Sequence, residues 1–462
     1  MLSESAKKET MRIKLSKPLP LSDIASLVNG RLIQSKNAII KFISINSKIT
    51  EPKDLFIPIK GQIYDGENFA QELKEKGCFI LGENIDTADI LVADTKRSLL
   101  DLANAFNKNL PYILYRIGIT GSVGKSTTKD FLSILLSEKY KVHKNDGNKN
   151  NDIGMPLTLL SAPEESQILI SEMGMNHMGE IKKLSECLMP NLGIITNIGR
   201  AHIGNLGSRE NIANAKLEIL CGMKSGKLII PYDEPLLSCV KEKNTFSTST
   251  KEADFYIEEG KGNEVFIYQN QKLICNASFG LSEKHFKNCL IAACAIAINC
   301  GLSCDELVSG ISKISRENLR QFDICRENIL FCADYYNSSP ESVAASIEGV
   351  QKRYPNQKKS LLLGDMLELG NESDAIHQEV GANIPRGVFD KLFLFGSHAQ
   401  QIGIGALGKS FGVEKIFLNT NITQPEITAR QIRENCDAGE IILMKASRGV
   451  HLERVLDLFS KD

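Results

Sequence analysis

The chain has 462 residues, 42% of them hydrophobic and 24% charged, which is ordinary for a globular protein with more than one domain. Its 55 basic and 56 acidic side chains nearly cancel, so charge gives no reason to expect nucleic acid or an anionic membrane as a partner. No apolar stretch approaches the ~20 residues that span a bilayer, and the N-terminus, MLSESAKKETMRIKL, lacks the apolar core of a secretory signal.

The twelve cysteines include no C-x-x-C pair, so they do not suggest a zinc site. Free thiols in this number suit a reducing compartment, and the sequence predicts a cytoplasmic protein.

Residues 1–11 are interpreted as a polar tail and residues 12–107 as a small α/β unit. Apolar runs predict strands, and a polar-apolar stretch at 67–76 predicts a helix among them. The predicted strands are residues 39–43, 55–59, 79–81 and 90–92. This unit by itself indicates no chemistry.

A second unit, residues 108–320, carries the stretch IGITGSVGKSTT at 117–128. It lies between an apolar run at 112–115, interpreted as a strand, and an amphipathic run at 129–140, with a helix expected to start near Lys125. Strand, glycine-rich turn, Lys-Ser and helix together predict a phosphate-binding loop. Lys125 would reach the β- and γ-phosphates, and the Ser126 hydroxyl would bind Mg²⁺. Ile119 breaks the strict G-x-x-x-x-G-K-[ST] pattern, and a glycine turn before an ordinary helix is the alternative.

Further apolar runs in this unit, at 168–171, 192–196 and 228–230, lack alternation and therefore indicate a parallel sheet buried on both faces. Ligands bind beyond the carboxyl ends of such strands. Glu172 and His202 follow two of these runs and are expected at the same edge as the loop. Glu172 could hold a hard cation or could be a solvated carboxylate, and His202 could be a ligand or a structural residue.

Two other features of this unit have both a functional and an ordinary interpretation. Lys216 lies in a predicted helix at 211–219, where a lysine is usually a solvated charge. Asn148, Asn150 and Asn151 lie in a polar loop that suits a sugar or amide-rich ligand, although asparagines also serve turns.

The third unit, residues 321–462, repeats the pattern of apolar runs that end in polar clusters. The runs at 329–331, 360–363, 391–395 and 441–444 predict a second doubly wound, Rossmann-like domain. The sequence therefore predicts an α/β protein of three domains: a small α/β N-terminal domain, a central parallel sheet of the P-loop ATPase type, and a C-terminal Rossmann-like domain.

From about residue 40 onward the chain resembles the Mur ligases, ATP-dependent amide-bond-forming enzymes of peptidoglycan precursor synthesis. The resemblance rests on the order and spacing of these segments: GITGSVGKSTTK, GNKNNDIGMPLTLL, EMGMNHMGEI, TNIGRAHIGNLGSRENIANAKLEIL, DYYNSSPESVAA, LGDMLELG and KASRGVHLE. It implies a ligase that adds D-alanyl-D-alanine to UDP-N-acetylmuramoyl-tripeptide through an acyl phosphate, giving ADP and phosphate. The implied cofactors are ATP and two Mg²⁺ ions, and the implied state is a monomer.

The resemblance also implies roles for individual residues. Lys216 would be carbamylated by CO2 and would help to hold a second Mg²⁺, which requires a neutral amine and hence a lowered lysine pKa. Lys125, Lys216, His202 and Arg320 are the implied catalytic residues, and Ser126, Glu172, His202 and Lys216 are the implied metal ligands. Nucleotide contacts would come from Thr120, Gly121, Ser122, Val123, Gly124, Lys125, Ser126, Thr127, His285, Asn288, Arg320 and Asp334. Acceptor and dipeptide contacts would come from Ser47, Lys48, Lys60, Gly61, Asn148, Asn150, Asn151, Asn337, Lys445, Ser447 and Arg448, with the first four holding the uridine nucleotide.

The chain departs from the usual family pattern at a few positions. Val123 replaces an asparagine in the loop, Asn46-Ser47-Lys48 stands for Asp-Ser-Arg, and Ala333 and Pro231 occupy positions that are often aspartate and asparagine. Two alternatives remain at this point. One is a family member that adds a different amino acid, although no DNPR-like motif is present, and the other is a nucleotide-binding regulator or plain NTPase.

Overall fold

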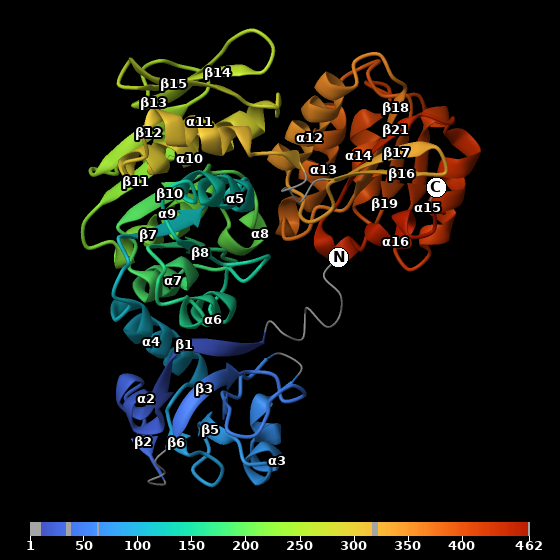
Figure 1. The fold of residues 1–462 in the computed structure, drawn as a ribbon. Coiled ribbons are helices and arrows are strands. Elements are labelled where there is room, and N and C mark those ends of the chain that lie inside the picture. Colours follow the sequence, from blue (N-terminus) through green and yellow to red (C-terminus); the bar gives the residue numbers. More distant parts are fainter. Residues whose placement is uncertain (1–10, 34–37, 62–63, 317–321, 461–462) are drawn as a thin grey trace. The chain divides into compact units, whose positions relative to one another are not determined.

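The computed structural model describes residues 11–33, 38–61, 64–316 and 322–460. Three sheets with flanking helices follow one another along the chain (Figure 1). Within the described residues, 1–120, 139–194 and 217–228 form one compact unit, and 121–138, 195–216 and 229–462 form a second. The predicted tail at 1–11 lies outside the described residues apart from Met11.

The N-terminal sheet has six strands in the order β1-β3-β4-β5-β6-β2. These are β1 (Arg12–Pro20), β2 (Arg31–Leu32), β3 (Ile39–Ser44), β4 (Leu55–Phe56), β5 (Phe79–Gly82) and β6 (Ile90–Leu91), with helices α2 (Leu21–Leu27), α3 (Ala70–Glu75) and α4 (Thr95–Lys108). The four predicted strands are confirmed, although β4 is shorter than the apolar run. Strand β1, which pairs antiparallel with β3, was missed because its sequence, RIKLSKPLP, has few apolar residues and two prolines.

The central sheet has nine strands in the order β15-β14-β13-β12-β11-β10-β7-β9-β8. These are β7 (Tyr115–Thr120), β8 (Val142–Lys144), β9 (Ile168–Glu172), β10 (Leu192–Ile195), β11 (Lys227–Pro231), β12 (Lys243–Ser247), β13 (Phe255–Glu259), β14 (Glu264–Gln269) and β15 (Lys272–Ser278). The helices of this part are α5 (Lys125–Leu136), α6 (Gly154–Leu160), α7 (Glu180–Leu188), α8 (Ile203–Leu206), α9 (Arg209–Leu217), α10 (Lys284–Asn299) and α11 (Cys304–Ser312).

Two details of the central sheet differ from the prediction. The strand before the glycine loop is not 112–115 but Tyr115–Thr120, because Tyr112 and Leu114 are more than half exposed and the buried run starts later. The sheet is also mixed, since β13, β14 and β15 pair antiparallel at one end. The core β7-β9-β8 is parallel, as predicted.

The C-terminal sheet has the order β16-β17-β21-β18-β19-β20 and is parallel except for the edge strand β16. Its strands are β16 (Phe322–Arg326), β17 (Ile329–Ala333), β18 (Lys359–Gly364), β19 (Leu392–Phe395), β20 (Ile416–Asn419) and β21 (Ile441–Lys445). The helices are α12 (Pro340–Arg353), α13 (Ser373–Ala382), α14 (Ala399–Ala406), α15 (Pro425–Asn435) and α16 (Glu453–Leu456). All four predicted strands are present, and the doubly wound domain is confirmed.

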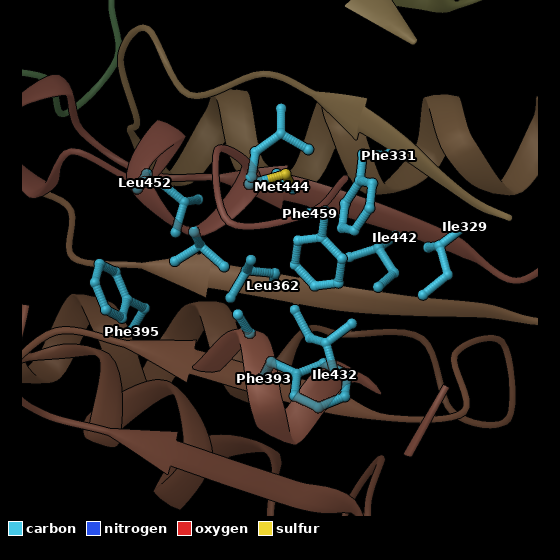
Figure 2. Packing of buried hydrophobic residues seen from close by; sticks show 14 of the residues in the cluster. Ile329, Phe331, Leu362, Phe393, Phe395, Ile432, Ile442, Met444, Leu452 and Phe459 are labelled. Atoms are coloured by element: carbon cyan, nitrogen blue, oxygen red, sulfur yellow. The ribbon is translucent and has the colours of Figure 1, made fainter. Parts of the chain in front are cut away.

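One hydrophobic cluster fixes the C-terminal sheet against its helices (Figure 2). Phe331, Ile442 and Phe393 come from strands β17, β21 and β19, and Ile432 and Phe459 come from the helical side. All five side chains are at most 3% exposed. Their burial stabilises the strand ends from which the predicted site residues of this domain extend.

Candidate active site

The glycine-rich loop joins the carboxyl end of β7 to the start of α5. Gly121 has φ +149° and Gly124 has φ +80°, in the region that L side chains rarely adopt. A Cβ on Gly121 would also lie 1.8 Å from the hydroxyl of Thr196, so only glycine fits there. The predicted glycine loop and the helix that starts at Lys125 are therefore confirmed, and the strand before them is Tyr115–Thr120.

Lys125 and Ser126 are the first two residues of α5. The Lys125 ammonium donates to the carbonyl oxygens of Gly121 at 2.8 Å and Ser122 at 3.3 Å, so the side chain lies back along the loop. The helix start adds backbone N–H groups and a positive dipole end, and such a combination of loop, lysine and helix start binds phosphate. Thr120 is fully buried and Thr127 half-buried at the two sides of the loop.

Glu172 lies at the end of β9, in register with Ile119 of the neighbouring parallel strand β7. The strand that ends in the glycine loop and the strand that ends in Glu172 therefore reach the same sheet edge, as predicted. Glu172 is only 2% exposed, which contradicts the solvated alternative.

The asparagine loop holds Glu172 in place. Asn150 donates from its amide nitrogen to Glu172 Oε1 at 2.8 Å, and Asn145 pairs with the Glu172 backbone through both ends of its amide group. Asn151 accepts from the Gly154 N–H at 2.8 Å at the start of α6, which is a turn role. Of the three predicted asparagines, Asn150 is the one whose side chain orients the carboxylate, and Asn148 accepts the Asn150 N–H through its backbone.

Lys216, near the end of α9, is only 1% exposed, so the interpretation as a solvated helical lysine is wrong. Burial lowers the pKa of Lys216 well below its ordinary value, and the positive charge of Lys125 lowers it further. A neutral amine at this position can act as a nucleophile, whereas an ammonium cannot.

His202 follows β10 and has a left-handed backbone, with φ +66°. Its Nδ1 lies beside a carboxylate oxygen of Glu368. The histidine is thus placed by the turn before α8 and by an acidic side chain that the sequence did not predict.

In the C-terminal domain, Asp334 follows β17 and Lys445 ends β21, and these two strands are parallel neighbours. The Lys445 ammonium is 2.8 Å from Asp334 Oδ2 and 3.0 Å from the carbonyl oxygen of Asn337, and Ser346 donates to the same Asp334 oxygen. The sequence assigned Asp334 to the nucleotide and Lys445 to the peptide, and the structure brings them together in one ion pair.

Ser447 and Arg448 follow β21. The Ser447 hydroxyl accepts from the Leu367 N–H at 2.9 Å, and the Arg448 guanidinium lies 5.5 Å from the centre of the Tyr336 ring. These contacts place both residues beside the turns that follow strands of this sheet.

His285 and Asn288 lie in the first turns of α10. Burial lowers the pKa of His285 to about 4, so the imidazole is neutral at neutral pH. Asn288 accepts a hydrogen bond from the Thr248 hydroxyl at 2.8 Å. A neutral imidazole and an amide suit a purine base, which is uncharged and carries both donors and acceptors.

Two sequence-family comparisons bear on the whole arrangement. Residues 119–296 match the Mur ligase middle domain, and residues 322–448 match the Mur ligase glutamate ligase domain at the C-terminus. UDP-N-acetylmuramoyl-tripeptide--D-alanyl-D-alanine ligase of Bacillus subtilis (strain 168) is 37% identical over 452 residues, which cover 94% of this chain and 97% of the relative. The chain belongs to the Mur ligase family.

Other relatives and solved structures give the same picture. The Escherichia coli (strain K12) ligase of the same name is 28% identical, and the match covers 94% of this chain and 97% of the Escherichia coli protein. A MurF crystal structure from Acinetobacter baumannii matches with a TM-score of 0.85 at 25% identity, covering 96% of this chain and 99% of that one. The MurF ligase of Thermotoga maritima in complex with ADP matches with a TM-score of 0.77 at 28% identity, covering 90% and 96%. The predicted family and the three-domain α/β architecture are confirmed.

The residues of this Mur ligase suit magnesium better than a softer metal. Across the described ranges no cluster of three or more His, Cys, Asp or Glu side chains is found. Mg²⁺ needs no such cluster, because it is usually held by one or two protein oxygens together with phosphate oxygens and water. The buried Glu172 carboxylate and the Ser126 hydroxyl are oxygen donors of that kind.

The predicted uridine contacts lie in the N-terminal domain. Lys48 is exposed, and its N–H donates to the Asn46 side chain at 3.0 Å. The Lys60 side chain is 81% exposed, Gly61 donates to the Tyr64 carbonyl at 2.8 Å, and Ser47 is half-buried. These positions are accessible to a ligand, and their role remains a prediction.

The predicted catalytic residue Arg320 lies outside the described residues. Among the helices of the described residues, none is both long enough and apolar enough to cross a membrane.

The sequence reasoning missed Thr196 and Asn197, which directly follow β10 and contact the glycine loop. Their place at the end of a buried parallel strand could have suggested them.

Proposed function

We propose that this Mur ligase uses ATP to join D-alanyl-D-alanine to UDP-N-acetylmuramoyl-tripeptide, giving the pentapeptide precursor of peptidoglycan, ADP and phosphate. The observation that carries the proposal is the match to ligases of this name, which for the Bacillus subtilis relative covers 94% of this chain and 97% of the relative. The glycine loop, the buried Glu172 and the buried Lys216 add the groups that such a reaction needs.

The reaction requires an activated carboxyl group, because a carboxylate is a poor electrophile. An oxygen of the tripeptide carboxylate attacks the γ-phosphorus of ATP, the bond to the β-phosphate oxygen breaks, and ADP leaves. The amine of D-alanyl-D-alanine then attacks the carbon of the acyl phosphate, loses a proton, and phosphate leaves from the tetrahedral intermediate. Both steps bring anions together, so positive charge must offset their repulsion.

This chain supplies that charge and its arrangement. Lys125 would turn from the loop carbonyls toward the β- and γ-phosphates. Glu172, oriented by Asn150, and Ser126 would hold Mg²⁺, which offsets phosphate charge when bound. Arg320 would reach the γ-phosphate from the C-terminal side, and closure of that domain would exclude water from the acyl phosphate.

We propose that Lys216 is carbamylated and helps to hold a second Mg²⁺ together with His202. Carbamylation joins the neutral amine nitrogen to the carbon of CO2 and releases one proton, which leaves an anionic oxygen ligand. The lowered pKa of the buried Lys216 supports this proposal, since it makes the neutral amine available at a lower pH than in an exposed lysine.

The finer assignments are proposals of the same kind. His285, Asn288 and Asp334 would contact the nucleoside, the N-terminal residues Ser47, Lys48, Lys60 and Gly61 the uridine nucleotide, and Asn337, Lys445, Ser447 and Arg448 the peptide and dipeptide. The domains would span 12–107, 108–320 and 321–462. The enzyme would act as a monomer in the cytoplasm, where its twelve free cysteines would stay reduced.

The test is phosphate release with ATP, Mg²⁺ and UDP-N-acetylmuramoyl-tripeptide, with and without D-alanyl-D-alanine. We expect release to depend on the dipeptide and the product to have the mass of the pentapeptide. Lys125→Met should abolish release, whereas Lys183→Met, a matched change of an exposed lysine on α7, should not. Release with a different amine only would overturn the substrate, and release that no amine stimulates would favour an NTPase or regulator.

A further inference from the structure

The turn after β10, residues 196–199, holds the glycine loop by hydrogen bonds that run in both directions. The Asn197 side-chain oxygen accepts the Ser122 N–H at 3.0 Å and the Val123 N–H at 2.9 Å. The Ser122 N–H is also 3.2 Å from the Asn197 carbonyl oxygen. One carboxamide oxygen therefore serves two successive N–H groups of the loop.

The return bonds come from the two sides of Asn197. The Thr196 hydroxyl donates to the Val123 carbonyl oxygen at 2.6 Å, and the Gly199 N–H donates to the Ser122 hydroxyl at 2.8 Å. The same Thr196 hydroxyl lies where a Cβ of Gly121 would be. The backbone N–H of Ser122 and both backbone polar groups of Val123 are thus bonded to this turn, 73 to 75 residues away along the chain.

These bonds decide which loop groups can serve a phosphate. The N–H groups of Ser122 and Val123 point at an uncharged oxygen of the protein. The loop leads into α5, and the positive end of that helix's dipole attracts a phosphate. A loop of this kind binds an anion well only if its backbone is already in the right shape, because ordering it on binding would reduce affinity.

We infer that Asn197 is a positioning residue for ATP: it fixes the backbone at Ser122 and Val123, and with it the shape of the loop that receives the phosphates. Asn197 does not itself contact the nucleotide in this arrangement. The inference rests on the proposed assignment of the glycine loop to ATP, and it goes beyond that assignment by naming the group that shapes the loop.

The test compares three variants of the full-length enzyme. Asn197→Leu keeps the side-chain size and removes the acceptor, whereas Asn197→Asp keeps an acceptor oxygen. Asn214→Ala, at an exposed asparagine on α9, is the matched control. In Asn197→Leu the Val123 N–H loses its acceptor and the Ser122 N–H keeps only the backbone carbonyl oxygen of residue 197. Loss of an acceptor in this way commonly weakens an equilibrium by roughly 10-fold.

Three measurements separate positioning from a general loss of structure. Hydrogen exchange of the Ser122 and Val123 amides, without nucleotide, should be faster in Asn197→Leu and unchanged in Asn197→Asp. The ADP dissociation constant, by calorimetry, should rise roughly 10-fold in Asn197→Leu and stay unchanged in Asn214→Ala. The KM for ATP should rise while the KM for D-alanyl-D-alanine stays the same.

The inference is overturned if Asn197→Leu binds ADP as tightly as the wild type or more tightly. The Asn197 side-chain bonds would then contribute nothing to ADP binding, or would compete with the phosphates for the loop N–H groups. Equal exchange rates in Asn197→Leu and Asn197→Asp would also overturn it. If Asn197→Leu does not fold, hydrogen exchange of the wild type provides the test. The Ser122 and Val123 amides must stay protected from exchange when ADP binds, and loss of that protection overturns the inference. Failure of the wild type to bind ADP at all would instead overturn the assignment of the loop on which the inference rests.

Discussion

Replacing Lys216 by methionine should change how the stability of the enzyme depends on pH. Lys216 is only 1% exposed, and burial followed by the nearby charge of Lys125 lowers its pKa well below the ordinary 10.5. Methionine has a similar length and no charge to bury. The variant therefore removes the penalty of placing an ammonium in the interior.

The sign of the effect follows from proton binding. Below the folded-state pKa of Lys216 both states carry the proton, so the wild type bears the whole penalty. As the pH rises from there toward 10.5, the folded state loses the proton while the unfolded state keeps it, and the wild type gains stability relative to the variant. The gain is about 1.4 kcal/mol for each pH unit across this window, and above it the difference between the proteins is constant.

The assay is urea unfolding of wild type and Lys216→Met in CO2-free buffer, at steps from about pH 7 to about pH 10, with exposed Lys183→Met as the control. We expect the stability of Lys216→Met minus that of the wild type to shrink as the pH rises, and the control to show no trend. Bicarbonate should stabilise the wild type and not Lys216→Met, because CO2 that adds to the folded amine acts as a ligand of the native state. Parallel stability curves for wild type and Lys216→Met would refute the reasoning about burial, and equal responses to bicarbonate would refute carbamylation.

Three further predictions concern the hydrogen bond to Glu172, the hydrophobic cluster of the C-terminal domain and the buried His285. Asn150→Ala removes the 2.8 Å hydrogen bond that orients Glu172. The Mg²⁺ concentration for half-maximal activity, measured by titration, should therefore rise about 10- to 100-fold. An unchanged Mg²⁺ requirement would argue against a metal at Glu172. Phe331→Ala, in the fully buried cluster, should lower the stability of the C-terminal domain by about 3–5 kcal/mol, whereas Leu458→Ala, 42% exposed, should change it by about 0.5 kcal/mol or less in urea unfolding. Burial lowers the pKa of His285 from 6.5 to about 4, so the unfolded state takes up the proton at a higher pH than the folded state. As the pH falls from 6.5 to about 4, the free energy of unfolding of the wild type should therefore decrease by about 3 kcal/mol. His285→Leu should lose less stability over the same range, and equal slopes would show that His285 titrates normally.

Much of the secondary structure was predictable from local sequence, for physical reasons that act within a few residues. Unbroken apolar runs such as 441–444 form strands because both faces of a parallel sheet are buried, and β21 is buried throughout. The glycine loop was predictable because positions 121 and 124 need backbone conformations that favour glycine, and Lys-Ser at a helix start suits phosphate. Strands β1, β14 and β15 were missed because exposed residues interrupt the buried ones along them. Strand β13 was missed although its first three residues are buried.

The site was predictable in its residue types and family resemblance, but its contacts depend on the tertiary structure. Lys216 has the sequence surroundings of a surface lysine, and only packing of α9 makes it a buried amine with a lowered pKa. Asn197 acquires its role because β10 ends beside the glycine loop, some 75 residues away in the chain. Sequence determines which groups are available for the chemistry. Burial and hydrogen bonding between distant segments decide their protonation and their direction, because both depend on solvent exclusion and on neighbours that local sequence does not specify.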